Sequence, residues 1–310
     1  MLYKIYEDSN LSSLSCPIRE NVSFKGICIR ITGTNESTEA ELEDVGLIQY
    51  VKNGQQMINC NFDWLMALSH MLGGNPKDDS TSSGALRFFV YIPRFFFDDN
   101  VEHVTPEDNA RISCTFNAGL DTGIASGGKV EVFLDVEDGI QKYDLIINTH
   151  AESMAGAATA VMTLEQPNIL AIGVSDLVSS VLTTASSAIT KYSIAVGGVS
   201  HGDAAIGSWV DYTNCVMNLE SDYVIATLPF RASGDITSRL KDTANLSIVT
   251  SGAAEPQVVV LSAQFDDKRL TRSLDARNAR IIERTQSKIL SNRADTLAVV
   301  KRVAGVTVNK

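Results

Sequence analysis

The chain has 310 residues, of which 44% are hydrophobic and 20% are charged, and its formal net charge is -11. That length and apolar content suffice for one or two sizeable cores, which excludes an intrinsically disordered protein. The acidic balance argues against a protein whose main surface coats nucleic acid, since such surfaces are usually basic.

Residues 1–20 are expected to form an N-terminal arm. The first ten residues contain charges and no apolar run, so we expect no secretion signal and synthesis in a reducing cytosol. The five cysteines are widely spaced and lack a C-x-x-C pair, which favours neither zinc nor a disulfide framework; they are Cys16, Cys28, Cys60, Cys114 and Cys215.

In the first half, alternating apolar residues predict strands, because successive side chains point to opposite faces of a strand. Asn53 and Gly54 predict a tight hairpin turn, since a type I′ turn needs positive φ at both central residues. Trp64, Leu65 and Leu68 recur at helical steps and predict a short helix over 62–72. The predicted strands cover residues 21–32, 47–51, 86–92, 111–116, 129–136 and 143–148.

The second half begins with small residues over 151–167, which predict a linker. Leu177, Val178, Val181 and Leu182 recur at helical spacing and predict a helix between residues 175 and 190. Strands are predicted at 168–174, 192–199, 208–217, 223–228, 244–249 and 257–262.

One pattern occurs twice: an apolar strand ending in an aliphatic residue and proline, then a bend rich in Asp or Arg, then two further strands. Pro93 ends the first of these apolar strands and Pro229 the second. The match pairs residues 86–93 with 222–229, 111–115 with 245–249, and 129–134 with 257–261. The period far exceeds the roughly 20 to 50 residues of solenoid repeats, so it indicates a duplicated domain.

These patterns predict an all-β fold of two consecutive eight-stranded antiparallel jelly rolls, with short helices in loops and a C-terminal helical segment. The predicted boundaries are an arm at 1–20, a first jelly roll at 21–150, a linker and second jelly roll at 151–267, and a basic helical segment at 268–310.

The segment 268–310 carries eleven Lys or Arg and three acids, a local charge of +8. Its apolar residues fall at helical intervals. Three interpretations stay open: a solvated helix, an arm on an acidic partner subunit, or a segment facing anionic lipid or nucleic acid. Arginine suits phosphate better than lysine, and the candidates for that contact are Arg269, Arg272, Arg277, Arg280, Arg284 and Arg293.

Three consecutive aromatic residues, Phe95, Phe96 and Phe97, cannot all face one core from a strand, because side chains alternate. We expect at least one of them to contact a neighbouring domain or subunit. The alternative is a core corner between the two sheets.

Motifs for chemistry are absent from the sequence. It has no P-loop, no dinucleotide-binding glycine pattern and no H-E-x-x-H, and its four histidines are isolated. The acidic pairs at 78–79, 98–99 and 266–267 could hold a cation such as Ca²⁺, but solvated loop charge is the simpler interpretation. We expect no catalytic residue, no metal and no cofactor.

The chain resembles the double jelly-roll major capsid proteins of icosahedral viruses, particularly phages with an internal membrane, over about residues 21–265. The matching elements are an early strand closing on Asn53 and Gly54, a short helix, the sequence YIPRFFFDDN, a Pro-Glu-Asp turn at 106–108 and the strand ARISCTFNAG. The sequence IATLPFRASGD at 225–235 repeats the pattern and indicates the second barrel.

This resemblance implies a structural protein and not an enzyme. Three chains would close into a pseudo-hexameric capsomer that tiles an icosahedral shell. The implied partners are further copies of the chain, minor capsid or vertex proteins and, through the basic segment, internal membrane lipid or the genome. The implied location is the virion capsid, assembled in the host cytoplasm.

Two other functions remain as alternatives. A two-jelly-roll glycan hydrolase, similar to peptide N-glycanases, would need acids in the cleft between barrels, and its candidates are Asp98, Asp99, Glu102 and Asp203. A carbohydrate-binding module would expose Trp or Tyr platforms, whereas Trp64 and Trp209 both lie within apolar patterns.

Overall fold

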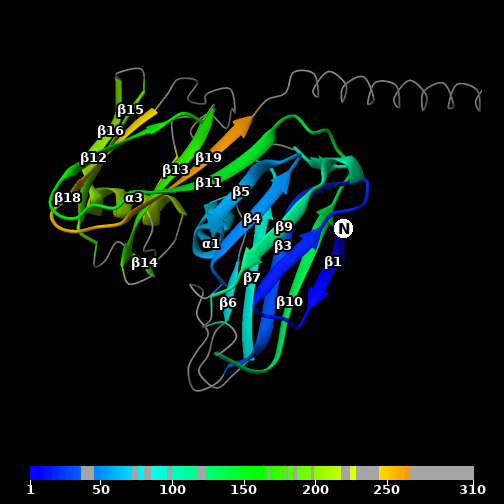
Figure 1. Cartoon of the computed structure of the whole chain (residues 1–310). Coiled ribbons are helices and arrows are strands. Elements are labelled where there is room, and N and C mark those ends of the chain that lie inside the picture. The colour runs from blue at the N-terminus through cyan, green and yellow to red at the C-terminus, as the bar shows by residue number, and fades with distance from the viewer. Residues whose placement is uncertain are drawn as a thin grey trace, which may run out of the picture.

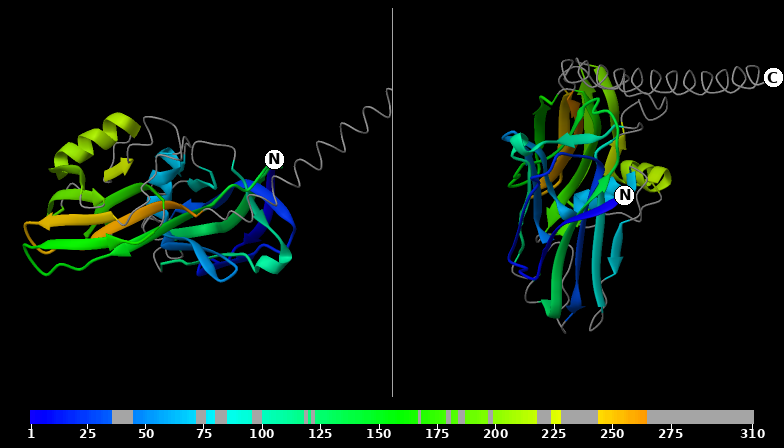
Figure 2. Two further views of the ribbon diagram at one scale, coloured as in Figure 1. Left: turned by 90° about the horizontal axis from the view of Figure 1, so that it is seen from above. Right: turned by 90° about the vertical axis from the view of Figure 1, so that its right-hand side faces the viewer.

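Strands make up most of the computed structural model, which describes residues 1–35, 45–71, 76–79, 85–95, 100–117, 120, 123–166, 168–178, 181–183, 187–196, 199–217, 224–227 and 244–264. They form two units that lie side by side (Figure 1 and Figure 2). We call residues 1–136 the first unit and residues 144–264 the second unit.

The first unit contains β1 (Leu2–Asp8), β2 (Ser13–Pro17), β3 (Val22–Asn35), β4 (Leu47–Lys52), β5 (Gln55–Asn61), α1 (Phe62–Met71), β6 (Lys77–Asp79), β7 (Ala85–Pro93), β8 (Glu102–Val104), a 3-10 turn (Pro106–Asp108), β9 (Arg111–Thr115) and β10 (Ile124–Val136). The second contains β11 (Asp144–Ala151), β12 (Thr159–Leu164), β13 (Ile169–Val178), β14 (Val181–Thr183), β15 (Ile189–Val196), β16 (Val199–Ala205), α3 (Ile206–Met217), β17 (Val224–Thr227), β18 (Ala244–Thr250) and β19 (Pro256–Gln264).

Strand pairing follows the same plan in both units. The first unit has the orders β1-β10-β3-β7 and β5-β4-β9-β2, and the second has β11-β19-β13-β17 and β16-β15-β18-β12. Read along the chain, these strands correspond one to one, and α1 and α3 each follow the corresponding strand, β5 or β16. The three matched sequence segments fall on corresponding strands, in agreement with the predicted duplication; Pro229 lies outside the described residues.

The cores lie between the sheets of each unit. In the first unit Val130, Val132 and Leu134 of β10 are fully buried, and they alternate with Glu131 and the half-buried Phe133 on the outer face. Burying one such aliphatic side chain contributes about 1.5 to 3 kcal/mol, so each long alternating strand contributes strongly to stability.

The two units share a sheet, which the sequence did not predict. β11 pairs with β19 in antiparallel fashion and with β5 in parallel fashion, Ile147 opposite Ile58 and Asn148 opposite Asn59. One nine-stranded sheet therefore crosses both units. The expectation of wholly antiparallel pairing is corrected here, because β11 covers the edge that β5 would otherwise expose.

Helix α1, which was predicted from residue 62, lies beside β5 at the boundary between the units (Figure 1). Its residues from Phe62 to Ser69 are all buried. The indole of Trp64 lies against Gly173 of β13 in the second unit, where a Cβ atom would stand 2.7 Å from the ring and 2.6 Å from a methyl group of Val259. Only glycine fits this position, so the two units pack as one body.

Two predictions in the second half are wrong. Residues 208–217, expected as a strand, form most of α3, because Ile206, Trp209 and Thr213 recur at helical steps and the Trp209 ring stacks on Tyr192 with centroids 4.6 Å apart. The helix expected between 175 and 190 is instead the hairpin of β13 and β14, with Leu177 opposite Leu182. Apolar residues on both sides of a short hairpin imitate a helical period.

Other predicted boundaries also change. The expected arm, 1–20, contributes β1 and β2 to the sheets of the first unit, and the expected linker, 151–167, contains β12. The strand predicted at 143–148 is β11, which pairs with β19 of the second unit. The helical segment at 268–310 lies outside the described residues. None of the described helices has the length and apolar content that crossing a bilayer requires.

Gly173→Ala should lower the free energy of unfolding by about 1 to 3 kcal/mol, because the added methyl group overpacks the space between Trp64 and Val259. Urea denaturation measures this. Gly156→Ala is the matched control, since nothing lies within 4 Å of its added Cβ, and it should be neutral or slightly stabilising. Equal stability of the two variants would contradict the tight contact between the units.

Candidate functional site

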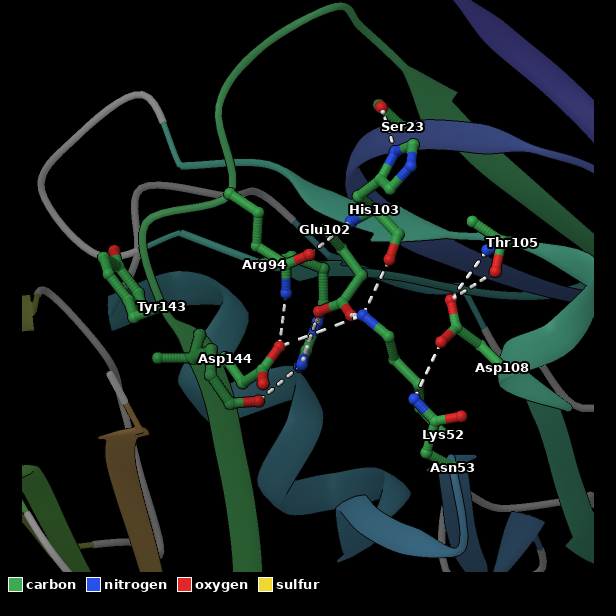
Figure 3. Close-up of polar contacts among 12 residues, drawn as sticks. Ser23, Lys52, Asn53, Arg94, Glu102, His103, Thr105, Asp108, Tyr143 and Asp144 are labelled. Carbon is green, nitrogen blue, oxygen red and sulfur yellow. Dashed lines mark hydrogen bonds and ion pairs between the residues drawn. The ribbon is translucent and has the colours of Figure 1, made fainter. Parts of the chain in front are cut away.

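A buried group of charged side chains lies where the first unit meets β11; we call Lys52, Arg94, Glu102 and Asp144 the junction cluster (Figure 3). Arg94 and Glu102 are fully buried, and Lys52 and Asp144 nearly so. Lys52 Nζ lies 2.6 Å from Glu102 Oε1 and 3.9 Å from Asp144 Oδ1. Arg94 donates from Nη2 to Glu102 Oε2 at 3.2 Å and to the carbonyl oxygen of Leu145.

Four separate elements bring these side chains together. Lys52 ends β4, Arg94 directly follows β7, Glu102 begins β8 and Asp144 begins β11. The guanidinium carbon of Arg94 lies 5.4 Å from the centroid of the Tyr50 ring, within cation–π range. The cluster therefore joins three elements of the first unit to the first strand of the second.

Asn100 completes this junction with backbone contacts. Its amide nitrogen donates to the carbonyl oxygens of Arg94 at 2.7 Å and Tyr143 at 3.1 Å. Its amide oxygen accepts from the backbone N–H groups of Lys142 at 2.7 Å and Tyr143 at 3.2 Å. One buried side chain thus fixes the path of the chain into β11.

The charges in the cluster set the ionisation of Glu102. Burial alone would raise its pKa, but the positive charges of Arg94 and Lys52 outweigh burial and lower the pKa below the ordinary value of 4.5. Burial, aided by the charge of Glu102, raises the pKa of Tyr50 well above 10.0. Glu102 is therefore a carboxylate at neutral pH, and its two oxygens are occupied by cations. Such a group is poorly placed to exchange protons with a substrate.

The predicted turn at Asn53 and Gly54 adjoins this site. Both residues have positive φ, 53° and 75°, as the sequence predicts. Asn53 Nδ2 donates to Asp108 Oδ1 at 2.7 Å, and the backbone N–H of Thr105 donates to Asp108 Oδ2 at 2.7 Å. Burial opposes the change, but these hydrogen bonds and the charge of Lys52 lower the pKa of Asp108. The Pro-Glu-Asp turn is thereby fastened to the hairpin of β4 and β5.

The outer face of β1, β10 and β3 carries a second group of charges, which we call the charged ladder: Lys4, Glu7, Arg30, Lys129 and Glu131. Lys129 lies 2.7 Å from Glu7 and 3.2 Å from Glu131. Arg30 lies 3.1 Å and Lys4 3.6 Å from Glu131, and Lys4 also pairs with Glu7. The hydrogen bonds from Lys129 and Lys4 lower the pKa of Glu7 to about 2.

Of the contact residues predicted from the sequence, the structure describes only Phe95. Phe95 follows Arg94 and is half-buried. Phe96 and Phe97 lie outside the described residues, as do all six candidate arginines: Arg269, Arg272, Arg277, Arg280, Arg284 and Arg293. Their predicted contacts stay predictions. Within the described ranges, no three His, Cys, Asp or Glu side chains gather as a metal ion would need.

The acids that a glycan hydrolase would recruit do not gather in the described structure. Glu102 is buried in the junction cluster, whereas Asp203 lies on β16 of the second unit, 2.7 Å from Lys191. Asp98 and Asp99 lie outside the described residues. Nothing in this geometry favours hydrolysis.

Sequence reasoning missed the junction cluster. The sequence did not single out Lys52 or Arg94, since single ionic residues carry no spacing signal, and Glu102 was considered only as a candidate acid of the hydrolase alternative. One clue existed: Arg94 directly follows the buried strand end Ile92 and Pro93, a place where an arginine can be drawn into the core with its counter-charge.

Glu102→Gln should lower the free energy of unfolding by about 3 to 5 kcal/mol near pH 7, because it leaves two buried cations short of a counter-charge. Since the folded pKa of Glu102 is lowered, its contribution is complete above about 4.5 and is lost as the pH falls through the folded value. The difference between wild type and variant in urea denaturation should therefore shrink toward pH 3. The exposed control Glu107→Gln should change stability by less than about 0.5 kcal/mol; equal effects at both positions would contradict this assignment.

Comparison with known proteins finds the likeness in structure and not in sequence. No protein-family model matches the chain, and no curated protein matches it. The major capsid protein P2 of bacteriophage PM2 matches with a TM-score of 0.61 and 11% identity, covering 86% of this chain and 98% of that chain.

Two further solved structures agree. A chain from the atomic structure of Sulfolobus turreted icosahedral virus matches with a TM-score of 0.61 and 12% identity, covering 92% of this chain and 94% of that one. A chain of the PBCV-1 virus capsid matches with a TM-score of 0.55 and 10% identity, covering 85% and 92%. The chain therefore has the double jelly-roll fold of viral major capsid proteins, and the resemblance expected from its sequence is confirmed at the level of the fold.

Proposed function

We propose that this chain is a structural major capsid protein, three copies of which close into a pseudo-hexameric capsomer that tiles an icosahedral shell. The observation that carries the proposal is the repeated pairing plan, β1-β10-β3-β7 with β5-β4-β9-β2 and β11-β19-β13-β17 with β16-β15-β18-β12. We take each set as one eight-stranded jelly roll. The likeness to capsid proteins of three viruses supports the same function.

The duplication suits a trimer with a hexagonal outline. A hexagonal building block needs six similar wedges, and two similar units per chain supply six in a closed trimer while every chain stays equivalent. The tight contact at Trp64 and Gly173 supports the proposal, because a rigid pair of units can present a constant shape to neighbours. We place the units at residues 1–136 and 144–264 in preference to the division at residue 150.

The segment at 268–310 is proposed to face the interior of the shell. Its local charge of +8 stands against the overall -11, so anionic lipid headgroups or the genome suit it as partners. Minor capsid or vertex proteins would meet the capsomers at the shell, which is located in the virion and assembled in the host cytoplasm. Phe95, Phe96 and Phe97 remain our candidates for contacts between subunits.

The mass of the purified full chain tests the proposed function. We expect mass photometry to find a species of three times the 33.5 kDa chain mass, and negative-stain electron microscopy to show particles with six-fold outlines or shells. A species that stays monomeric at micromolar concentration, under conditions where the chain is folded, would overturn the proposal.

Removal of residues 270–310 tests the role of the basic segment. Both units should keep their thermal unfolding transition, since none of their described core residues is removed. The truncated chain should lose sedimentation with vesicles of anionic lipid, or fail to assemble beyond capsomers. Insoluble or unfolded truncated protein would show instead that the segment belongs to the core.

A further inference from the structure

We infer that α3 of one copy docks on the charged ladder of a second copy, with Ser208 placed over Arg30. This inference rests on the proposed trimer and names the surfaces that would form it. It follows from comparing the contact inside the chain with the corresponding surfaces that the chain leaves exposed.

The contact inside the chain supplies the template. Helix α1 of the first unit places the Trp64 ring against Gly173 of β13, beside Val259 of β19 in the second unit. It is buried on every side from Phe62 to Ser69. If the units of neighbouring chains repeat this arrangement around a ring, α3 of each chain takes the place of α1.

Helix α3 holds the position in the second unit that α1 holds in the first, but one face of α3 is exposed. Strands β5 and β16 each have seven residues and lead directly into their helices, so Ser208 corresponds to Trp64. Trp209 and Thr213 turn toward the second unit, Trp209 stacking on Tyr192. In contrast with α1, the residues Ser208, Asp211, Tyr212 and Cys215 are exposed, Tyr212 by 40%.

The strand register identifies the surface that corresponds to Gly173. Gly173 pairs with Val259 of β19 and Ile225 of β17. Arg30 pairs in the same way with Glu131 of β10 and Phe89 of β7. The prolines of the sequence repeat set Phe89 opposite Ile225, so Arg30 holds the position of Gly173, at the β3 end of the charged ladder.

The two pairs are complementary in size. Inside the chain a large indole meets a glycine that has no room for a methyl group. Between chains a small hydroxyl group on α3 would meet a long arginine. In both contacts one side chain is large and the other is small or absent. The total side-chain volume is therefore similar, as close packing at an interface requires.

The charges agree with this assignment. The ladder has three cations and two carboxylates; the side chains of Lys4, Arg30 and Lys129 are exposed by 45%, 43% and 35%, that of Glu7 by 43% and that of Glu131 by 7%. The ladder therefore carries a formal excess of one positive charge, on a chain whose net charge is -11. The carboxylate of Asp211 and the hydroxyl group of Tyr212 on α3 are suitable partners for its cations.

A second copy of the chain would use both faces together. Each chain offers one α3 face and one charged ladder, and these differ from one another. Such a head-to-tail contact closes into a ring when the rotation between copies permits. The ring would bury both faces in every copy.

Cross-linking tests the placement. In a Cys215→Ser background, which removes the one exposed thiol among the described cysteines, Arg30→Cys and Ser208→Cys are combined in one chain. A short bismaleimide should give covalent trimers and nothing larger on a denaturing gel. Either cysteine alone, or Ser208→Cys combined with Glu107→Cys on the exposed 3-10 turn, should give monomers.

Bulk at Ser208 gives an independent readout. Ser208→Trp should raise the concentration at which half the chains are monomeric by about ten-fold or more, because the indole collides with Arg30. The matched control Glu107→Trp should leave it unchanged, and circular dichroism should report both variants folded. A wild-type trimer that neither cross-links at 30 and 208 nor responds to Ser208→Trp overturns the docking and leaves the proposed function intact. A monomeric wild type overturns the proposed function itself.

Discussion

The outer face of β11, β19 and β13 must be kept from water, and the rest of the architecture depends on how this is done. β19 is buried on both of its faces from Pro256 to Ala263, so the sheet cannot stand alone in solvent. Trp64 of helix α1 packs against it at Gly173, where the missing side chain leaves room for the indole beside Val259. Two similar units thereby become one rigid object, whereas the corresponding face of the first unit carries ion pairs and tolerates water.

The junction cluster fixes the relative position of the elements that this apolar contact holds together. Desolvating its charges is unfavourable, and replacing such groups by well-packed apolar side chains often costs nothing in stability. What Lys52, Arg94 and Glu102 provide is geometry, because an apolar interface slides easily whereas hydrogen bonds to a chosen carbonyl group do not. The bond from Arg94 to Leu145 and the four contacts of Asn100 fix β11 in one register.

Much of the fold could be predicted from local patterns, and the exceptions have physical causes. Alternation identified the long strands such as β7 and β10, and Asn53 with Gly54 identified the hairpin, because both depend on neighbours in sequence. The two wrong predictions between residues 175 and 217, a helix predicted where a hairpin forms and a strand predicted where α3 forms, have one cause: short apolar runs fit the period of either structure. The parallel join of β5 and β11 and the assembly of Lys52 with Glu102 depend on distant residues, which one sequence does not reveal.

The parallel pairing of Ile147 with Ile58 also has a consequence for synthesis on the ribosome. The first unit, residues 1–136, can close while the second is still being translated, but the outer edge of β5 then lacks its neighbour until β11 emerges. An unpaired strand edge is a template for joining another nascent chain. Polysomes that synthesise many copies side by side therefore expose a brief window for aggregation, and its length is set by how soon β11 follows β10 out of the exit tunnel.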